Sequence, residues 1–133
     1  MYTVDDALPT VAEYRALREA VAWASPSPEA CRTALGGSVF AVVARRRQQV
    51  VGMARVVGDR TMYLLVVDVV VHPAHQGAGL GRSLAERVVG WAQEQGARST
   101  LLVADDDVAA FYASLGFAPD TGGRLMRLTR RPL

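Results

Sequence analysis

The sequence predicts a mixed α/β domain, a sheet flanked by helices, and three observations support this class. β-branched runs separated by polar turns predict strands, and other stretches repeat apolar residues at helical spacing. A strand also runs directly into a glycine-rich turn and a helix at residues 66–82, VVDVVVHPAHQGAGLGR. With 133 residues, half of them hydrophobic, the chain is long enough for one buried core without disulfides or metals, and we expect a single domain.

Two helices are expected near the start. Thr10 can cap a helix over Val11–Trp23, because Glu13 stands three residues after the cap. The segment Ser25–Pro28 then breaks the chain, and a short helix over Pro28–Leu35 follows it. The apolar positions that give the first helix its period are Tyr14, Leu17 and Val21.

The strands come mainly after these helices. Val39–Ala44 and Val50–Val57 flank the polar segment RRRQQ, as expected of two antiparallel strands and their turn. The run Thr61–Val71 is almost continuously apolar, which predicts a central strand covered on both faces. Further strands are expected at Thr100–Ala104 and near Arg124–Leu128.

The glycine-rich turn predicts an anion site. Gly77, Gly79 and Gly81 allow a sharp turn that points several N–H groups at one spot, and the helix that begins there adds its positive dipole end. A phosphate or pyrophosphate is the expected ligand. The helix should pack on the sheet through one stripe, Leu80, Leu84, Val88 and Trp91.

Two phosphate-binding classes fit the turn poorly. A nucleotide-triphosphate loop needs Gly-Lys before Ser or Thr, and the chain has no lysine. A dinucleotide-binding fingerprint needs a third glycine where Arg82 stands, and too little chain follows Asp105 for a second half. Acyl-CoA enzymes are the remaining class.

Two spaced motifs resemble those of the GNAT superfamily of N-acyltransferases. The family signature is Gln or Arg, two residues, Gly, one residue, then Gly or Ala, and Gln76–Gly81 reads QGAGLG. Downstream, Phe111–Phe117 reads FYASLGF and resembles the family's segment ending in Leu-Gly-Phe. The detailed resemblance covers Asp68–Phe117, and a looser one covers Val39–Leu128. It implies one N-acetyltransferase domain over residues 1–133, with a cofactor-binding core at about 66–117.

The resemblance implies a mostly antiparallel sheet flanked by helices, whose fourth and fifth strands splay apart. It also implies acetyl-CoA as the cofactor and no metal. The pantetheine arm would pair with the fourth strand at Val69, Val70 and Val71. The pyrophosphate would lie on the turn, at Gln76, Gly77, Ala78, Gly79, Leu80, Gly81 and Arg82. Asp105 stands where the family often has an asparagine that contacts the cofactor.

Transfer of an acetyl group to an amine poses two proton problems, and each has a candidate residue. The resemblance indicates Tyr112 as the proton donor to the departing thiolate; aromatic packing is the alternative. Asp68 lies inside an apolar strand, where burial would make it a useful base for the amine. The alternative for Asp68 is a solvated position or an ion pair with an arginine such as Arg55.

The resemblance implies an acceptor pocket in the region of Trp23, Arg55 and Pro119–Arg124. For Trp23 the pattern favours the alternative, an interhelical core position at the end of an amphipathic helix. His72 and His75 lie where the strand leaves the sheet, and we expect structural or solvent-facing roles for them. Cys31 cannot form an internal disulfide and is expected to pack in the core. The hydrophobic balance leaves room for a homodimer, but no isolated amphipathic stripe identifies a dimer surface.

Composition and charge limit the kinds of partner and location that we expect for this protein. The formal net charge is +2, and the arginines are scattered apart from Arg45–Arg47, so we expect no nucleic-acid partner. No apolar run approaches membrane-spanning length and no signal pattern is present, so a cytoplasmic protein is expected. The predicted function is acetyl transfer from acetyl-CoA to a primary amine of a small molecule by direct attack. The alternatives are a protein acetyltransferase, acting on a lysine or an N-terminus, and a non-catalytic acyl-CoA-binding module.

Overall fold

The computed structural model describes residues 1–130 of the 133. These form two compact units, residues 1–103 and the segment that begins at Ala104. The first unit contains a sheet and three α-helices, and the second contains the short helix α4, Ala109–Ala113. Among the described residues, no helix is long and apolar enough to cross a membrane.

The sheet of the first unit has five strands in the order β1-β2-β3-β4-β5. The first four pair antiparallel, and β5 pairs parallel with β4. This confirms the predicted fold class, a mixed and mostly antiparallel sheet. The strands are β1 (Tyr2–Asp5), β2 (Phe40–Arg46), β3 (Gln49–Gly58), β4 (Tyr63–Val71) and β5 (Ser99–Leu101).

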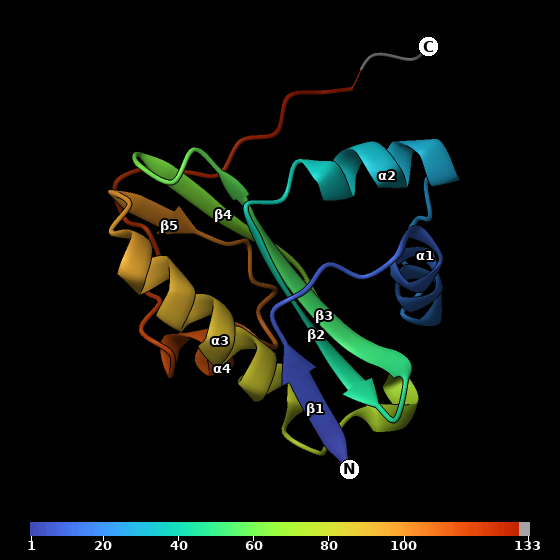
Figure 1. Cartoon of the computed structure of the whole chain (residues 1–133). Helices are drawn as coiled ribbons and strands as arrows, with labels where there is room; N and C mark the ends of the chain where they lie inside the picture. The colour runs from blue at the N-terminus through green and yellow to red at the C-terminus, as the bar shows by residue number, and fades with distance from the viewer. Residues whose placement is uncertain (131–133) are drawn as a thin grey trace. The chain divides into compact units, whose positions relative to one another are not determined.

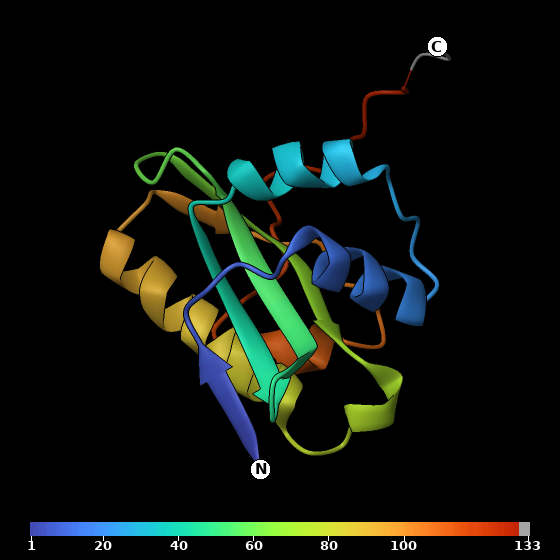
Figure 2. The same cartoon turned by 45° about the vertical axis from the view of Figure 1, so that its right-hand side comes forward.

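Helices cover both faces of this sheet (Figures 1 and 2). The helix α3 (Leu80–Gln95) packs on one face, and α1 (Val11–Ala20) and α2 (Pro28–Gly36) pack on the other. The stripe expected on α3 packs on the sheet as predicted: Leu80, Leu84 and Val88 are buried in the core on that side, and Trp91 packs against it partly buried. The core on the other side contains Tyr14, Leu17, Cys31, Leu35, Val43, Val50, Met53 and Val70.

The fourth and fifth strands splay, as the resemblance implied. β5 pairs with β4 only at Tyr63, Leu64 and Leu65. From Val66 to Val71, no strand within residues 1–130 pairs with the outer edge of β4. The Val71 carbonyl accepts from the side chain of Gln76. The other outward backbone groups along that edge have no strand partner in the described residues, so they can pair with a ligand.

A β-bulge at Asp68 reverses the order in which the side chains of β4 point to the two faces of the sheet. Met53 faces Val70 and Arg55 faces Val67, so β4 has one residue more than β3 in this interval. Asp68 takes the extra position with a φ of 54°. In a regular strand Val66 and Val70 would share one face, but Val66 belongs to the α3 core and Val70 to the α1/α2 core. The bulge thus directs Asp68 toward the α1/α2 face.

The first helix follows its prediction at one end only. Thr10 and Glu13 form the expected capping box, with bonds of 2.8 and 3.1 Å. The helix ends at Ala20 instead of Trp23, because Ala22 turns the chain with a φ of 60°. The N–H groups of Ala22 and Trp23 bond the carbonyls of Glu19 and Arg18, which is a Schellman motif with alanine in the glycine position. The second helix is confirmed within one residue.

The central strand starts later and lies less centrally than predicted. The carboxylate of Asp59 accepts the N–H groups of Thr61, Met62 and Tyr63, which extends the turn to Met62. These bonds lower the pKa of Asp59. β4 is next to the edge strand, and Tyr63 and Leu65 are exposed, so coverage on both faces was wrong for its first half.

Three further differences concern short strands. β1 was not among the predicted elements; its four residues are too few for a clear period. β5 ends at Leu101 rather than Ala104. The strand expected at 124–128 is absent from the described residues, where this segment has no ladder partner and Leu125, Met126 and Leu128 are exposed. An apolar pattern cannot form a strand without a neighbouring edge.

Candidate functional site

The free edge of β4 and the glycine-rich turn are consecutive parts of the first unit. Val69, Val70 and Val71 end the strand, and the 3-10 turn Pro73–His75 connects it to the glycines. The side chain of Gln76 donates from Nε2 to the carbonyl oxygen of Val71 at 3.1 Å. The predicted pantetheine and pyrophosphate residues, 69–71 and 76–82, are therefore adjacent in space.

The glycine turn has the backbone that the motif predicted. Gly77 and Gly79 have φ values of 87° and 80°, which only glycine adopts at little cost. A Cβ atom at either position would meet no heavy atom within 4 Å, so the space beside the backbone is open. Gly81 has no such φ value. A small ligand can approach the turn closely at Gly77 and Gly79.

The helix α3 begins immediately after this turn. Its N-cap is Gly79, which has no side chain to satisfy the first N–H groups. These groups have no partner inside the helix and carry the positive end of the dipole. Arg82 lies in the first turn, half-exposed, and pairs with Glu86 at 3.4 Å. This geometry fits a pyrophosphate.

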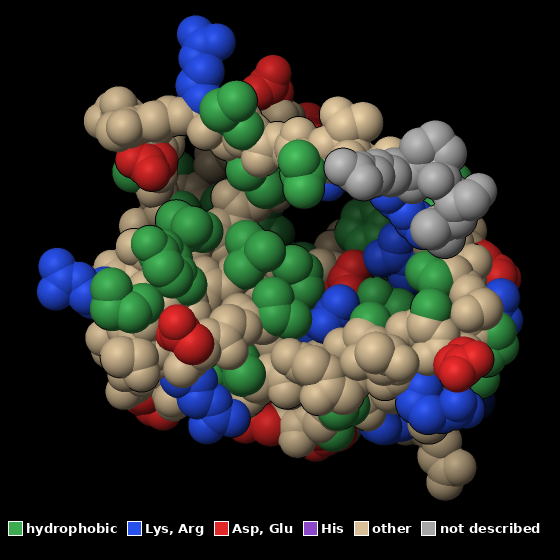
Figure 3. Space-filling model, turned by 90° about the horizontal axis from the view of Figure 1, so that it is seen from above, with side chains coloured by type: hydrophobic (Ala, Val, Ile, Leu, Met, Phe, Trp, Pro, Cys, Tyr) green, Lys and Arg blue, Asp and Glu red, His purple; other side chains and the backbone are tan. Residues whose placement is uncertain are grey.

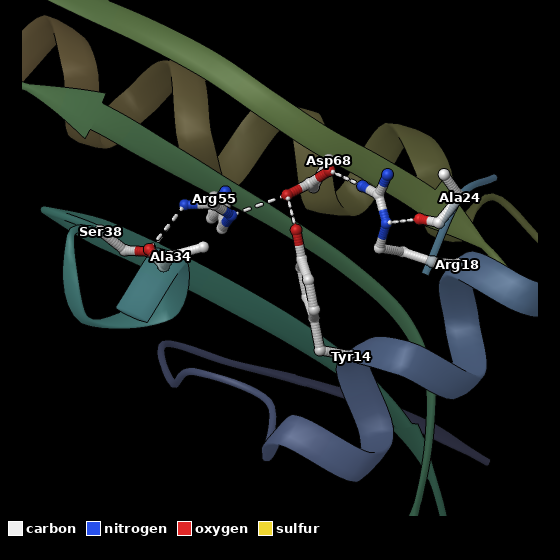
Figure 4. A network of polar contacts seen from close by, with 7 residues as sticks. All are labelled: Tyr14, Arg18, Ala24, Ala34, Ser38, Arg55 and Asp68. Carbon is white, nitrogen blue, oxygen red and sulfur yellow. Dashed lines mark hydrogen bonds and ion pairs between the residues drawn. The ribbon is translucent and has the colours of Figure 1, made fainter. Parts of the chain in front are cut away.

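A second polar group lies on the α1/α2 side of the sheet, centred on Asp68 (Figure 4). Its Oδ1 accepts from Arg18 Nη1 at 2.8 Å. Its Oδ2 accepts from Arg55 Nε at 2.7 Å and from the hydroxyl of Tyr14 at 2.6 Å. We call Tyr14, Arg18, Arg55 and Asp68 the Asp68 cluster.

In this cluster Asp68 is paired with arginines, which is the alternative to a catalytic base that the sequence left open. Its carboxylate is not free. Both oxygens hold charged or phenolic donors, so accepting a proton from an amine would displace a partner and break an ion pair. Arg55 is itself fixed, because its Nη1 donates to Ala34 O and Ser38 Oγ, both at 3.2 Å. Burial, and then the hydrogen bond to Asp68, raise the pKa of Tyr14.

Trp23 is not the interhelical core residue that one alternative expected. Its side chain follows the end of α1 and is 41% exposed. The guanidinium carbon of Arg18 lies 5.4 Å from the centre of its ring, within the range of cation–π attraction. Arg18 also donates from Nε to the carbonyl of Ala24 at 2.7 Å. Trp23 therefore borders the Asp68 cluster through Arg18.

Sequence reasoning missed Tyr14 and Arg18 as site residues. Tyr14 was interpreted as a core position of the first helix, and it is buried. Arg18 stands four residues later, so both lie on the same face of α1. An arginine one turn beyond a buried tyrosine, on a face that packs against a strand containing an aspartate, was the available signal.

Tyr112 and Asp105 belong to the second unit. Tyr112 lies in α4, and its ring makes edge contacts with Phe111 and Phe117 at centroid distances of 5.0 and 5.9 Å. Burial raises the pKa of Tyr112 above the usual value of 10.0. Asp105 is exposed ahead of the helix, and its carbonyl accepts the N–H of Val108. The aromatic packing is present, and the catalytic role stays a prediction.

Both histidines make structural contacts. His75 Nδ1 bonds the hydroxyl of Tyr2 at 3.0 Å, and His72 Nδ1 accepts the N–H of Ala74. Cys31 is fully buried and forms no disulfide, as expected of a packing residue, and its Sγ donates to the carbonyl oxygen of Pro26 at 3.6 Å. Within residues 1–130, no group of His, Cys, Asp and Glu could hold a metal ion. On the face in Figure 3, arginine side chains are dispersed among acidic and hydrophobic ones, without one basic stripe.

The model of the acetyltransferase (GNAT) domain family matches residues 37–119. The chain therefore belongs to the GNAT acetyltransferases, and it is an acyltransferase by family. This confirms the resemblance inferred from the two motifs, which both fall within the matched residues.

Curated relatives support the family and differ in their named activities. An uncharacterized N-acetyltransferase of Prochlorococcus marinus is 30% identical over 84% of this chain and 64% of its own length. The serotonin N-acetyltransferase 2 of rice is 44% identical over 53% of this chain, and the soybean histone acetyltransferase TAP1 is 35% identical over 58%. These alignments span about a third of the two plant proteins, 35% and 33%.

Solved structures have the same fold. A probable acetyltransferase from Staphylococcus aureus superposes with a TM-score of 0.88 at 26% identity, covering 98% of this chain and all of the other. A GNAT-family acetyltransferase from Streptococcus pneumoniae superposes with a TM-score of 0.83 at 28% identity, with the same coverage. A protein from Clostridium acetobutylicum described as a predicted acetyltransferase, crystallised with acetyl-CoA, shares the fold at 14% identity and a TM-score of 0.75 over 96% of each chain.

Proposed function

We propose that this protein transfers the acetyl group of acetyl-CoA to the primary amine of a small molecule, by direct attack. The observation that supports it most is the free edge of β4 beside the glycine turn, within a chain of the GNAT family. An extended ligand such as acetyl-CoA would use both features. The edge offers a ladder partner to an amide-bearing arm, and the turn offers N–H groups to phosphates.

Residues of the first unit would hold acetyl-CoA, which supplies a thioester open to attack by an amine. Val69, Val70 and Val71 would pair with the pantetheine arm, and the backbone of 76–82 would hold the pyrophosphate. Arg82 would add its charge near the phosphates. No metal takes part in this proposal.

Tyr112 would give a proton to the departing thiolate. Its raised pKa keeps the phenol protonated at neutral pH. An unperturbed phenol of pKa near 10 and a thiol near 8.5 differ by about 1.5 units, or about 2 kcal/mol. Burial widens this gap for Tyr112, so a hydrogen bond to the sulfur would lower the barrier even without full transfer. Phe111 and Phe117 hold the ring in place.

Asp68 would organise the acceptor site and not act as the base. Its two oxygens already hold Tyr14, Arg18 and Arg55. The amine would then lose its proton to water, which costs about 4.6 kcal/mol at neutral pH for an alkylammonium of pKa near 10.4. Activity should therefore rise with pH as the fraction of free amine increases.

Two other functions are kept as outcomes of the test. The similarity to the protein named histone acetyltransferase TAP1 supports a lysine side chain as the acceptor. The aspartate at 105, where the family often has asparagine, favours a module that binds acyl-CoA without turning it over. The cytoplasmic location stays a prediction.

The test is thiol release from acetyl-CoA with a panel of aryl, alkyl, polyamine, amino-sugar and amino-acid acceptors. The single cysteine is buried, so the protein contributes little thiol background. Tyr112→Phe should reduce turnover while leaving acetyl-CoA affinity nearly unchanged. Tyr63→Phe is the matched control, because its side chain is exposed on β4 and should not change turnover.

Three results would change the proposal. Equal turnover in Tyr112→Phe and the natural chain removes this residue from the mechanism. Release only with lysine-containing peptides establishes a protein acetyltransferase. No release with any acceptor, in a protein that acetyl-CoA still stabilises thermally, favours the binding module.

A further inference from the structure

The Asp68 cluster carries more positive than negative charge. Two guanidinium groups lie within 2.8 Å of one carboxylate, which leaves one positive charge in excess. Arginine stays charged at all physiological pH values. The cluster is also shielded from water, because the side chains of Asp68, Arg55 and Arg18 are only 10, 12 and 19% exposed. An uncompensated charge in such a place favours an anionic partner.

The two arginines differ in how firmly they are held. Arg55 bonds Asp68, Ala34 and Ser38 through two of its nitrogens. Arg18 makes two such bonds, from Nη1 to Asp68 and from Nε to Ala24, one fewer than Arg55. In Figure 4 each arginine has one terminal nitrogen without a partner among the residues drawn. Arg18 is the more exposed of the two. The excess charge is therefore presented to a ligand at Arg18.

Aromatic rings border Arg18 and limit its movement. Its guanidinium carbon lies 5.7 Å from the ring centre of Tyr14 and 5.4 Å from that of Trp23. These contacts and the bond to Asp68 fix the group before a ligand arrives, so little side-chain entropy remains to be lost on binding. A preorganised guanidinium suits a carboxylate, which it can bind through two hydrogen bonds.

We propose that the acceptor amine bears a carboxylate, as amino acids do, and that Arg18 binds this carboxylate. The proposal rests on the proposed function and names its substrate class. Asp68 is a positioning residue that holds Arg18, Arg55 in turn holds Asp68, and neither touches the acceptor. Polyamines and lysine-rich protein tails are disfavoured, because they would bring further positive charge to a cluster that already has an excess.

The experiment compares acceptors that differ only in the carboxylate. Thiol release from acetyl-CoA is measured with tryptophan and tryptamine, tyrosine and tyramine, and lysine and 1,5-diaminopentane. The natural chain should prefer the carboxylated member of at least one pair by about tenfold or more in kcat/KM, as a charge-assisted hydrogen bond provides.

Arg18→Gln should abolish this preference by raising KM for the carboxylated acceptor at least about tenfold, with a smaller change in kcat. Arg18→Lys should restore part of it, because the charge returns without the two-pronged geometry. The control is Arg32→Gln, which removes the same charge from an exposed position of α2. Thermal stabilisation by acetyl-CoA checks that each variant is folded.

The results separate the two proposals. Equal use of both members of every reactive pair, or an unchanged preference in Arg18→Gln, would overturn the carboxylate proposal and leave the acetyltransferase intact. Release with amines that lack a carboxylate, and with no amino acid, would do the same. No release with these pairs or with the broader panel would contradict both.

Discussion

The two polar regions of the first unit, the glycine-rich turn beside the β4 edge and the Asp68 cluster, are formed by different kinds of groups. The turn that we assign to the cofactor is made of backbone, from a free strand edge and the residues 76–82 that follow it directly. The Asp68 cluster is made of side chains that come from α1, β3 and β4. The backbone geometry of a turn is determined by consecutive residues, whereas a side-chain cluster depends on which segments, distant in the sequence, pack together. The first region should therefore tolerate side-chain changes that disrupt the second.

The largest effect on stability should come from Asp68→Asn. Asparagine keeps the size and tolerates the left-handed backbone of the bulge, so the change removes mainly the charge. Two poorly solvated arginines then face each other without their carboxylate, and we expect a loss of about 2–4 kcal/mol in the free energy of unfolding. Denaturant unfolding measures it.

Asp5→Asn is the matched control for Asp68→Asn. Asp5 is exposed, and its nearest arginine atom is 4.0 Å away, so we expect a change within about 0.5 kcal/mol. A loss as small as this in Asp68→Asn would show that the cluster contributes nothing to the stability of the sheet.

Gly79→Val should break the other region. A β-branched residue at a φ of 80° costs about 1–2 kcal/mol. The turn would relax away from its present backbone and lose N–H groups aimed at the phosphates, so acetyl-CoA affinity should fall at least about tenfold. Gly90→Ala is the control in the same helix, where a Cβ atom meets nothing within 4 Å. Unchanged affinity in Gly79→Val would remove the turn from the cofactor site.

Ala22→Gly tests the segment that brings Trp23 to Arg18. Ala22 has a φ of 60° in the glycine position of a Schellman motif, so glycine should raise the free energy of unfolding by about 0.5–1 kcal/mol. Ala16→Gly, at an exposed position inside α1, should lower the free energy of unfolding by about 1 kcal/mol. Losses in both variants would mean that Ala22 is not strained.

The smallest effect concerns pH and Tyr14. The pKa of Tyr14 is raised by burial and by Asp68, so the neutral phenol is favoured in the folded chain. Its contribution to stability is fully present below the unfolded pKa, about 10, and is lost as pH rises through the folded pKa. The stability difference between the natural chain and Tyr14→Phe should therefore shrink above pH 10. A constant difference from pH 8 to 11 would contradict it.

Local patterns predicted much of the fold. The capping box at Thr10, the hairpin strands and the stripe on α3 each depend on neighbouring residues, and each is confirmed. The strand expected at 124–128 was wrong, because a strand requires a partner that its own residues do not specify. The early end of α1 depends on Ala22 adopting a backbone that sequence rules reserve for glycine.

The sequence likewise predicted the part of the candidate site that consecutive residues form, but not the part that depends on distant residues. The glycine turn and the end of β4 could be read directly from one stretch of sequence. Asp68 was identified as a functional residue, yet its partners Tyr14 and Arg18 lie more than 45 residues away, on a helix read as a core element. The bulge that turns Asp68 toward them results from the register between β3 and β4, which sequence alone did not show.

Calorimetric titration of acetyl-CoA into Asp68→Asn and Gly79→Val, beside the natural chain, tests the separation of the two regions most directly. We expect Asp68→Asn, measured where it is still folded, to bind acetyl-CoA within about twofold of the natural chain, while Gly79→Val loses about tenfold or more. If Asp68→Asn lost affinity as much as Gly79→Val, the cluster and the turn would form one site, and their assignment to acceptor and cofactor would be wrong.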